Sequence, residues 1–296
     1  MNSLSILIPV YNYICINTVK RLKAQCDSLG STLKYEIIVA DDGSTDGNSI
    51  SSNEKINDFE YCKFICKPYN EGSAATRNFL AKESKYDWLL FLDSDVDIDN
   101  DRFIIKYLDA LQENTVINGG IMAGGLYDEL KTNLRYLYEH HEESFHTAEK
   151  RNLTPYKCFR SANFIIPRSI FLTILFNNSM KRYEDVYFGK VLKQHNIKII
   201  NINNPVVIND YENNEKYINK LELDMNILYN FRKELQGYSR LLSFYIQVQR
   251  IIPLFYLIKI WHRLMGRLER KILISKYTNL TVMKAYRIGY FISIKQ

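Results

Sequence analysis

In the first part of the chain, apolar runs of strand length alternate with segments of helical period. Strands are predicted over residues 5–10, 35–40, 61–67 and 88–92, and helices over 19–29, 72–85 and 103–111. Parallel strands joined by crossover helices form a sheet covered on both faces, because that connection closes well only when the helices pack over the strands. The predicted fold class is therefore α/β, completed by a strand at 163–167, a helix at 184–195 and a strand at 197–202.

Each of the first four strands is followed closely by a polar cluster rich in turn-forming residues. The clusters are Tyr11-Asn12, the DDGSTDG run at 41–47, the NEG run at 70–72 and the DSDVD run at 93–97. In parallel sheets, ligands bind beyond the carboxyl ends of the strands, where loops converge and helix N-termini point inward. The sequence therefore predicts a ligand site built from these clusters.

Charge is distributed unevenly along the 296 residues. Residues 228–296 hold 13 Lys and Arg against two acidic residues, which gives +11; the whole chain carries +6, so residues 1–227 carry −5. With 46% hydrophobic side chains, the chain can bury one large core and carry an appendage. We expect a globular domain over 1–227 and a basic helical tail over 228–296.

The basic tail contains short apolar stretches such as IIPLFYLIKIW at 251–261. Eleven residues with an internal Lys259 cannot span a bilayer, which needs about 20 apolar residues. Basic amphipathic helices with aromatic side chains suit the lipid interface, so a membrane surface is the expected partner. Packing on the first domain or a dimer contact is the alternative, and nothing in the tail resembles a nucleic-acid-binding module.

Cysteine usage and the N-terminal residues both bear on the cellular compartment. The five cysteines are an odd number scattered through apolar segments, which favours a reducing compartment. Cys62 and Cys66 lie in a strand-like run and are predicted to be buried thiols rather than metal ligands. Residues 1–10 lack the positive segment and the cleavage site of a signal peptide. We therefore expect a cytoplasmic protein, peripheral on the inner face of a membrane.

Residues 128–160 are polar, with clustered acids and weak periodicity. This pattern predicts a mobile segment over the ligand site. His140, His141 and His146 are interpreted as solvated loop residues of this segment, because they lie far along the chain from the polar clusters.

Asp93 and Asp95 stand at positions i and i+2 where an apolar strand ends. A hard cation such as Mg²⁺ or Mn²⁺ prefers oxygen ligands and keeps open positions for phosphate oxygens. A metal held there would anchor a diphosphate and neutralise the charge that develops as the diphosphate leaves. A solvated turn with an Asx cap is the structural alternative, and the position directly after a buried strand favours the metal.

Two of the remaining clusters have both a chemical and a structural interpretation. Asp41 and Asp42 can accept hydrogen bonds from a nucleobase or a ribose, or can form an Asx-turn that leads to a helix. Gly72 marks the start of a helix in which Arg77 can pair with phosphate or stack on a base, or can simply lie on the surface.

Glu184 and Asp185 in YEDVYFG stand at the start of another predicted helix. Carboxylates at a helix N-terminus are favoured by the macrodipole, so capping is a sufficient structural reason for them. The chemical interpretation is that one of them is a general base that accepts the proton of an attacking hydroxyl.

Taken in order, these strings resemble family 2 glycosyltransferases of the GT-A fold. The matching strings are SILIPVYN, IIVADDGSTDG, NEGSAATRN, FLDSDVD, SANFIIPRSIF and YEDVYFG, which together cover roughly residues 3–210. The resemblance implies a mostly parallel sheet with helices on both faces, followed here by a C-terminal helical extension. It also implies inverting transfer of a sugar from a nucleotide-diphosphate donor, expected to be a UDP-sugar, to a hydroxyl of a glycan or lipid-linked acceptor. Bacterial cell-surface or capsular polysaccharide synthesis is the expected setting.

The resemblance assigns a donor site to residues of the polar clusters. The nucleoside would be held by Tyr11, by Asp41 or Asp42, and by Arg77. The rest of the donor site would be formed by Pro9, Gly72, Asp93 and Ser94.

The resemblance also assigns the metal and the acceptor side. Asp93 and Asp95 would bind Mn²⁺ or Mg²⁺ together with the diphosphate, and Asp185 would be the base. Glu184 would help to hold the acceptor, and Asn163 would line the acceptor pocket.

One departure from the family pattern concerns the metal. Members often carry a metal-ligating His after the last strand, in a stretch like PVV-x-H, and the PVVIND run at 205–210 has Asn209 at that position. Asn209 or Asp210 would offer an oxygen to the metal instead.

Two alternatives belong to other functional classes. A non-catalytic protein that binds nucleotides or carbohydrates on a degenerate fold would tolerate loss of the carboxylates at 93, 95 and 185, which are all present. A sugar nucleotidyltransferase would show a Gly-rich phosphate loop with a basic residue directly after the first strand. The run Pro9-Val10-Tyr11-Asn12 has neither feature.

Overall fold

The computed structural model of this chain describes residues 2–143 and 146–294, which form two compact units. The first unit consists of Met1–Met122 and Phe145–Ile208, and the second of Ala123–Ser144 and Asn209–Gln296. The expected boundary at 227/228 falls inside helix α10 (Asn214–Asn230). This helix runs through 227 because Leu228 and Tyr229 continue its buried face, so the structure divides the chain earlier than the charge pattern does.

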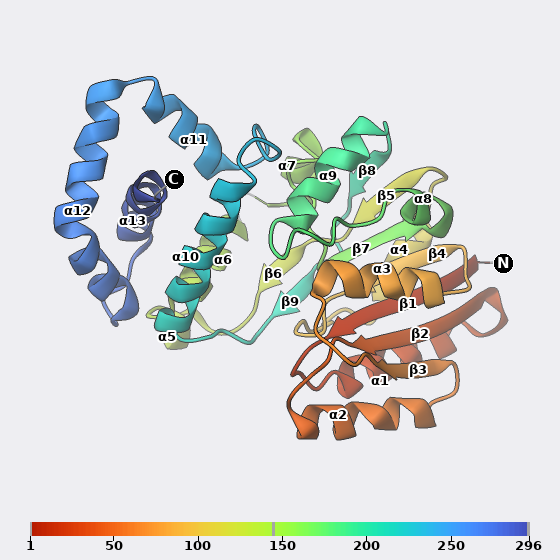
Figure 1. Ribbon diagram of the computed structural model, residues 1–296. Coiled ribbons are helices and arrows are strands. Elements are labelled where there is room, and N and C mark those ends of the chain that lie inside the picture. Colours follow the sequence, from red (N-terminus) through yellow and green to blue (C-terminus); the bar gives the residue numbers. More distant parts are fainter. Residues whose placement is uncertain (1, 144–145, 295–296) are drawn as a thin grey trace. The chain divides into compact units, whose positions relative to one another are not determined.

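A seven-stranded sheet in the order β3-β2-β1-β4-β7-β5-β8 forms the centre of the first unit (Figure 1). The strands are β1 (Asn2–Val10), β2 (Leu33–Asp41), β3 (Cys62–Cys66), β4 (Trp88–Leu92), β5 (Thr115–Asn118), β7 (Asn163–Pro167) and β8 (Lys198–Asn201). Neighbouring strands among β1 to β4 pair in parallel, and so do β5 and β8, whereas β7 is antiparallel to both of its neighbours. The predicted α/β class with a mostly parallel sheet is confirmed.

Helices cover both faces of this sheet (Figure 1). The helices of the first unit are α1 (Ile16–Asp27), α2 (Gly47–Glu54), α3 (Ser73–Glu83), α4 (Phe103–Ala110), α7 (Ala148–Leu153), α8 (Arg168–Thr173) and α9 (Glu184–Gln194). Two 3-10 turns, η1 (Gly30–Thr32) and η2 (Lys55–Asp58), precede β2 and β3. A short second sheet pairs β6 (Ile121–Ala123) with β9 (Val206–Ile208).

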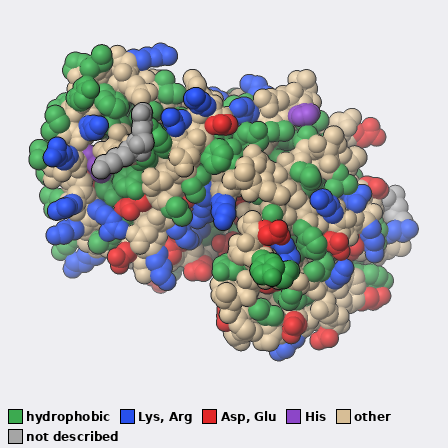
Figure 2. Space-filling model, in the orientation of Figure 1, with side chains coloured by type: hydrophobic (Ala, Val, Ile, Leu, Met, Phe, Trp, Pro, Cys, Tyr) green, Lys and Arg blue, Asp and Glu red, His purple; other side chains and the backbone are tan. Residues whose placement is uncertain are grey.

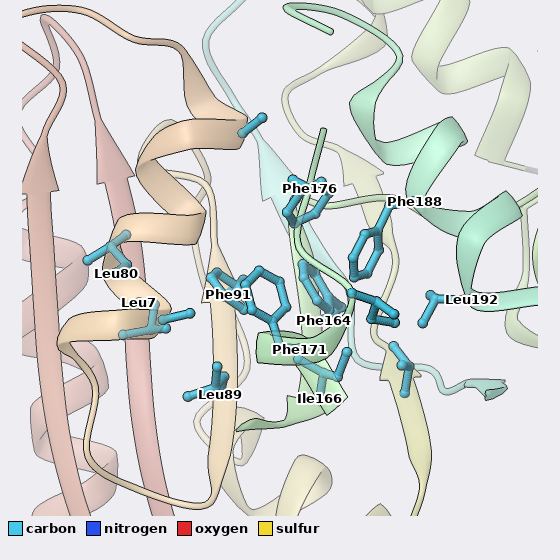
Figure 3. Packing of buried hydrophobic residues seen from close by; sticks show 14 of the residues in the cluster. Leu7, Leu80, Leu89, Phe91, Phe164, Ile166, Phe171, Phe176, Phe188 and Leu192 are labelled. Atoms are coloured by element: carbon cyan, nitrogen blue, oxygen red, sulfur yellow. The ribbon is translucent and has the colours of Figure 1, made fainter. Parts of the chain in front are cut away.

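An aromatic cluster joins α8 and α9 to the sheet, and we call it the phenylalanine cluster (Figure 3). Its members are Phe91 on β4, Phe164 on β7, Phe171 on α8, Phe176 in the following loop and Phe188 on α9. Phe176 and Phe188 stack with ring centroids 4.3 Å apart, and Phe91 and Phe171 lie 4.7 Å apart. Large buried rings contribute strongly to core stability. The phenylalanine cluster therefore holds α9, and the carboxylates at its N-terminus, in a defined place over the sheet.

The second unit is helical. Its helices are α5 (Tyr127–Leu130), α6 (Leu134–Glu143), α10, α11 (Arg240–Gln249), α12 (Ile252–Ile274) and α13 (Leu280–Ser293). Their shared core contains Leu134, Ile218, Leu273, Met283 and Tyr286. Leu134 belongs to the internal segment, so that segment and the C-terminal helices form one hydrophobic core.

Among the described helices, none is by itself long and apolar enough to cross a membrane. Helices α11 and α12 reach the required length and composition only when taken together, and their axes are bent by 117° at the break between them.

The prediction of a mobile segment over 128–160 is wrong for the described part of that range. The chain there forms α5, α6 and α7, with Leu134, Tyr136 and Arg151 buried. Helices α5 and α7 have only 4 and 6 residues, which is too few turns for a clear apolar period, whereas α6 has 10 residues and its buried face, with Leu134 and Tyr136, was missed. The predicted pair of buried thiols is also corrected, because Cys62 is half-buried and Cys66 is exposed on the edge strand β3.

Candidate active site

The predicted polar clusters do gather at one edge of the sheet, because parallel strands end on the same side. Val10 pairs with Asp41, and Asp41 pairs with Cys66, so β1, β2 and β3 end side by side. Strand β4 lies on the other side of β1 and ends just before Asp93. The loops after these four strands therefore form one continuous polar surface.

The turn after β1 is built against the loop after β2. Asn12 adopts a left-handed conformation with φ of 50°, and its side-chain oxygen accepts hydrogen bonds from the backbone N–H groups of Thr45 (2.8 Å) and Asp46 (3.0 Å). The backbone N–H of Asn12 donates to the hydroxyl of Ser44 at 2.7 Å. These bonds leave Tyr11 at the surface with 47% of the residue exposed, so its ring is accessible to a ligand.

Asp41 and Asp42 are both buried, and their partners differ. Asp41 accepts hydrogen bonds from the backbone N–H (2.9 Å) and the hydroxyl of Ser44. A carboxylate has room for about four hydrogen bonds, so Asp41 keeps acceptor capacity. Of the two, Asp41 is therefore the better candidate for contact with a nucleoside.

Asp42 is committed to an internal network. Its oxygens accept from Nζ of Lys67 (2.7 Å) and from the backbone N–H groups of Glu71 (3.0 Å) and Gly72 (2.8 Å). Burial by itself would raise the pKa of Asp42, but these hydrogen bonds outweigh it and the pKa is lowered. Lys67 also donates to the hydroxyl of Thr76 at 2.9 Å. Asp42 and Lys67 thus tie β2 to the start of α3.

Two glycines shape these loops. Gly43 has φ of +69°, and a Cβ there would lie 2.6 Å from the carbonyl carbon of Tyr69, so the loop after β2 touches the backbone of the loop after β3. Gly72 has φ of +93° and immediately precedes α3, at a conformation that few other residues adopt. Gly72 therefore directs its backbone N–H toward Asp42.

Arg77 is placed between two carboxylates, those of Asp93 and Glu184. Its side chain is 3% exposed, hydrogen-bonds through Nη2 to Oδ1 of Asp93, and has Nη1 at 3.6 Å from Oε1 of Glu184. The guanidinium also lies over the ring of Phe176, 5.5 Å from its centroid. Burial would lower the pKa of Arg77, but the charges of Asp93 and Glu184 raise it, so the side chain stays cationic. Nε and Nη1 of Arg77 are buried without a hydrogen-bond partner among the described residues, and the contact of Arg77 with a nucleoside stays a prediction.

Glu184 and Asp185 open α9 but have different surroundings. Glu184 accepts a hydrogen bond from the hydroxyl of Ser73 at 2.8 Å. Burial and the neighbouring Asp185 raise the pKa of Glu184, with Arg77 acting in the opposite direction. Asp185 is more open than Glu184 and lies with Oδ2 at 3.8 Å from Nη1 of Arg160. Asp185 is thus the better placed of the two to meet a ligand.

The metal assignment depends on the loop after β4. The backbone N–H of Asp93 donates to the carbonyl of Ala162 at 3.0 Å, which fixes the start of the loop. In the next two residues, the side chain of Ser94 is buried and that of Asp95 is exposed. Within residues 2–143 and 146–294, no group of three His, Cys, Asp or Glu side chains is arranged to hold a metal ion. Mg²⁺ is typically bound through one or two carboxylates together with substrate phosphates. Asp93 and Asp95 therefore fit a metal that binds together with a diphosphate.

Three further expected site residues have different positions. Pro9 is buried near the end of β1. Asn163 is 1% exposed, and its amide bonds to Tyr107 (2.6 Å) and to the carbonyls of Gly120 (2.9 Å) and Asn204 (2.8 Å). Asn163 is thus a structural link between strand ends, and its place in the acceptor pocket stays a prediction. Asn209 is exposed and begins the second segment of the second unit.

Sequence reasoning missed Lys67, Ser73 and Arg160. Lys67 could have been noticed as a basic residue directly after a strand and close to the NEG run. Ser73 gives no signal in the sequence, because its partner Glu184 is 111 residues away. Arg160 had no signal in the sequence, because its guanidinium is linked to Asp185 only through the packing of α9.

A cavity of about 280 Å³ lies in the second unit and contains none of the motif residues. It is lined by Tyr229, Arg232, Lys233, Gln236, Leu242, Tyr245, Ile246 and Gln249.

Similarity to known proteins was found at the level of sequence. A family model described as Glycosyl transferase family 2 matches residues 5–175. An uncharacterized glycosyltransferase from Haemophilus influenzae is 34% identical over 120 residues, which are 40% of this chain and 47% of that protein. A teichoic acid poly(glycerol phosphate) polymerase from Staphylococcus epidermidis is 32% identical over 101 residues, 32% of this chain and 13% of that one. The chain thus spans less than half the length of these curated relatives.

Similarity also extends to solved structures. TarS 1-349 of S. aureus in complex with UDP-GlcNAc has a TM-score of 0.53 and 18% identity, covering 98% of this chain and 90% of that chain. The mannosyltransferase PcManGT from Pyrobaculum calidifontis, in complex with GDP-Man and Mn²⁺, has a TM-score of 0.60 and 11% identity, covering 98% and 84%. At these identities the likeness concerns the fold, and the expected GT-A sheet with a helical C-terminal part is confirmed.

Proposed function

This chain belongs to glycosyl transferase family 2, and on that premise we propose that it transfers a sugar from a nucleotide-diphosphate donor to a hydroxyl group with inversion. One observation carries the proposal. Arg77 lies between Asp93 and Glu184, so a carboxylate of the DSD loop and one at the start of α9 are held together at the carboxyl edge of the sheet. Asp185 stands beside this ion-pair network. Donor and acceptor would therefore meet where these carboxylates converge.

The proposed step is a single displacement. The acceptor oxygen forms a bond to the anomeric carbon while the bond from that carbon to the diphosphate oxygen breaks, and the electron pair leaves with the nucleoside diphosphate. The hydroxyl proton passes to Asp185, which acts as the general base. Glu184 is less suited to this task, because Ser73 and Arg77 already engage its Oε1. Glu184 instead fixes the start of α9 and contributes to the acceptor side.

The donor side is proposed to be formed by the loops after β1, β2, β3 and β4. Tyr11 offers an exposed ring to the nucleobase of the donor, and Asp41 keeps acceptor capacity for hydrogen bonds from the nucleoside. Ser94 and the turn at Gly72 are the proposed contributions of the loops after β4 and β3. Mn²⁺ or Mg²⁺ would be held by Asp93 and Asp95. Such a metal neutralises the charge that develops on the departing diphosphate.

The donor is proposed to be a UDP-sugar. The likeness in fold to TarS, which was solved with UDP and with UDP-GlcNAc, supports this proposal. PcManGT was solved with GDP-Man, so guanosine donors are tested as well. The acceptor is proposed to be a glycan or a lipid-linked glycan of bacterial cell-surface or capsular polysaccharide synthesis. The local similarity to a teichoic acid polymerase supports that setting.

A donor screen tests this function. Purified protein, Mn²⁺ and a panel of UDP- and GDP-sugars are incubated with and without acceptor glycans, and the released nucleotide is identified. A transferase releases nucleoside diphosphate. A sugar nucleotidyltransferase would require pyrophosphate or release it, and a non-catalytic binding protein would release neither. Either of the last two outcomes would overturn the proposal.

The peripheral membrane location on the cytoplasmic side is likewise a proposal. It rests on the +11 charge of residues 228–296 and on the amphipathic character of that tail.

A further inference from the structure

Helix α12 exposes large apolar side chains along most of its length. They include Tyr256, Leu257, Ile260, Trp261, Leu264 and Leu268, with Leu264 73% exposed. The buried residues of the helix are Gly266, Glu269 and Leu273, which face the opposite side. Soluble helices normally turn such a face toward a core. The exposed side of α12 therefore has the composition of a contact surface.

Basic side chains share that exposed side of α12. Lys259, Arg263, Arg267 and Lys271 follow one another at intervals of four residues, so they form a row along the helix, and all four are exposed. Figure 2 shows Lys and Arg side chains interspersed with hydrophobic ones on the part of the surface where α12 lies in Figure 1. Together, this row and the six apolar side chains are called the α12 face.

The α12 face carries no exposed negative charge. Glu269 is the one acidic residue of α12, and it is buried, where it accepts a hydrogen bond from Nε1 of Trp261 at 2.8 Å. Arg270 is engaged with Glu222 of α10 at 2.8 Å and does not belong to the row. The charge on the face is therefore purely positive.

We propose that the α12 face docks on an anionic lipid bilayer, with the helix lying in the plane of the interface. The apolar side chains would enter the region between headgroups and acyl chains, and the basic row would contact anionic headgroups. A helix of 23 residues is about 35 Å long, so it would make an extended contact parallel to the surface. The α12 face of a second copy is a poorer occupant, because it would bring another purely positive surface against this one.

The proposal rests on the peripheral membrane location proposed above, for which it names the contact surface, and it is independent of the transferase activity. It is tested by flotation of the full chain with vesicles of phosphatidylcholine alone or mixed with phosphatidylglycerol. The chain is expected to float with the anionic vesicles and to be partly released by high salt, since screening weakens the electrostatic part and leaves the hydrophobic part. Arg263→Gln with Arg267→Gln should lower partitioning about 30-fold at low salt. Leu264→Gln should lower it about tenfold at any salt concentration.

Matched controls separate this surface from general charge and hydrophobicity. Lys34→Gln with Lys55→Gln removes the same charge from two exposed positions of the first unit, and Leu153→Gln removes one exposed leucine from α7. These controls should float like the unchanged protein. All variants replace exposed side chains, so their thermal melts should match that of the unchanged protein. Analytical sedimentation measures the oligomeric state of each variant.

Three results would overturn the proposal. The full chain could stay in solution with anionic vesicles, the α12 variants could float as well as the controls, or Leu264→Gln could dissociate an oligomer without changing flotation. The last result would identify the α12 face as a contact between protein chains.

Discussion

Asp185 is the residue on which the proposed chemistry depends most directly. Asp185→Asn is nearly isosteric but cannot take up the hydroxyl proton, so transfer should fall by about a hundredfold or more while donor affinity stays the same. Turnover and nucleotide binding are measured on the same preparation. A variant that keeps more than about a tenth of the original turnover would exclude Asp185 as the base.

A substitution at Asp95 tests whether this residue binds a divalent metal ion. Asp95→Ala should weaken binding of a nucleoside diphosphate in the presence of Mn²⁺ or Mg²⁺ and have little effect in excess EDTA, because the metal joins the carboxylate to the phosphates. Asp97→Ala, in the same loop, removes an equal charge and serves as the control. Equal weakening of the Asp95 variant with and without metal would show that Asp95 acts without a metal.

The buried pair of Asp42 and Lys67 makes a prediction about stability. Lys67→Met removes the cation that satisfies Asp42 and should lower the free energy of unfolding by about 3–5 kcal/mol, because Asp42 is left buried without its charged partner. Denaturant unfolding at pH 7 measures this loss. Lys34→Met is an exposed control and should change stability by less than about 0.5 kcal/mol.

The same pair sets a pH dependence. Folding lowers the pKa of Asp42. The contribution of Asp42 to the free energy of unfolding is therefore present above its unfolded pKa of about 3.9 and is lost as the pH falls through the folded pKa. Burial would lower the pKa of Lys67, but its hydrogen bonds to Asp42 and Glu71 outweigh burial and raise the pKa. The contribution of Lys67 to the free energy of unfolding is therefore present below its unfolded pKa of about 10.4 and is lost at higher pH. The stability difference between the original chain and Lys67→Met should therefore be largest between about pH 4 and 10. A difference that does not change with pH would show that the ion pair contributes little.

At the scale of elements, the loop after β2 depends on Gly43. Gly43→Ala introduces a Cβ 2.6 Å from the backbone of Tyr69 and retains a positive φ, so the free energy of unfolding should fall by more than about 2 kcal/mol. Gly47 begins α2 and has open space where its Cβ would lie. Gly47→Ala should therefore be neutral or stabilising by up to about 1 kcal/mol. Thermal or denaturant melts of the two variants compare the sites, and equal effects would contradict the close packing of the two loops.

At the scale of the whole molecule, the two units predict how the chain tolerates truncation. A chain that ends at Ile227 lacks Leu273, Met283 and Tyr286, which are core partners of Leu134 and Ile218. It should therefore expose apolar surface, bind a hydrophobic dye and lose helical content beyond that of the residues removed. Circular dichroism and dye fluorescence measure both effects. A truncated chain that melts cooperatively without binding dye would show that residues 228–296 form a separate domain.

The sequence by itself determined the succession of most strands and helices along the chain and the grouping of polar clusters at one edge. Those features follow from local patterns: strands of apolar residues, turn-forming residues directly after them, and the rule that parallel strands end on the same side. The predicted strands at 88–92 and 163–167 coincide with β4 and β7. The family could also be predicted, because its strings lie in a specific order.

Only the tertiary structure decided which polar side chains are exposed and which face one another. Asp42 has the sequence context of a ligand-binding residue, yet its carboxylate is engaged inside the protein. Arg77 is buried against Asp93, and Asn163 is enclosed by Tyr107 and two carbonyls. Arg160 and Ser73 meet the carboxylates of α9 across long stretches of chain. The physical reason is that a charged or polar side chain takes its role from the partners that packing brings within about 3–4 Å, and a sequence pattern carries no information about partners that lie so far along the chain.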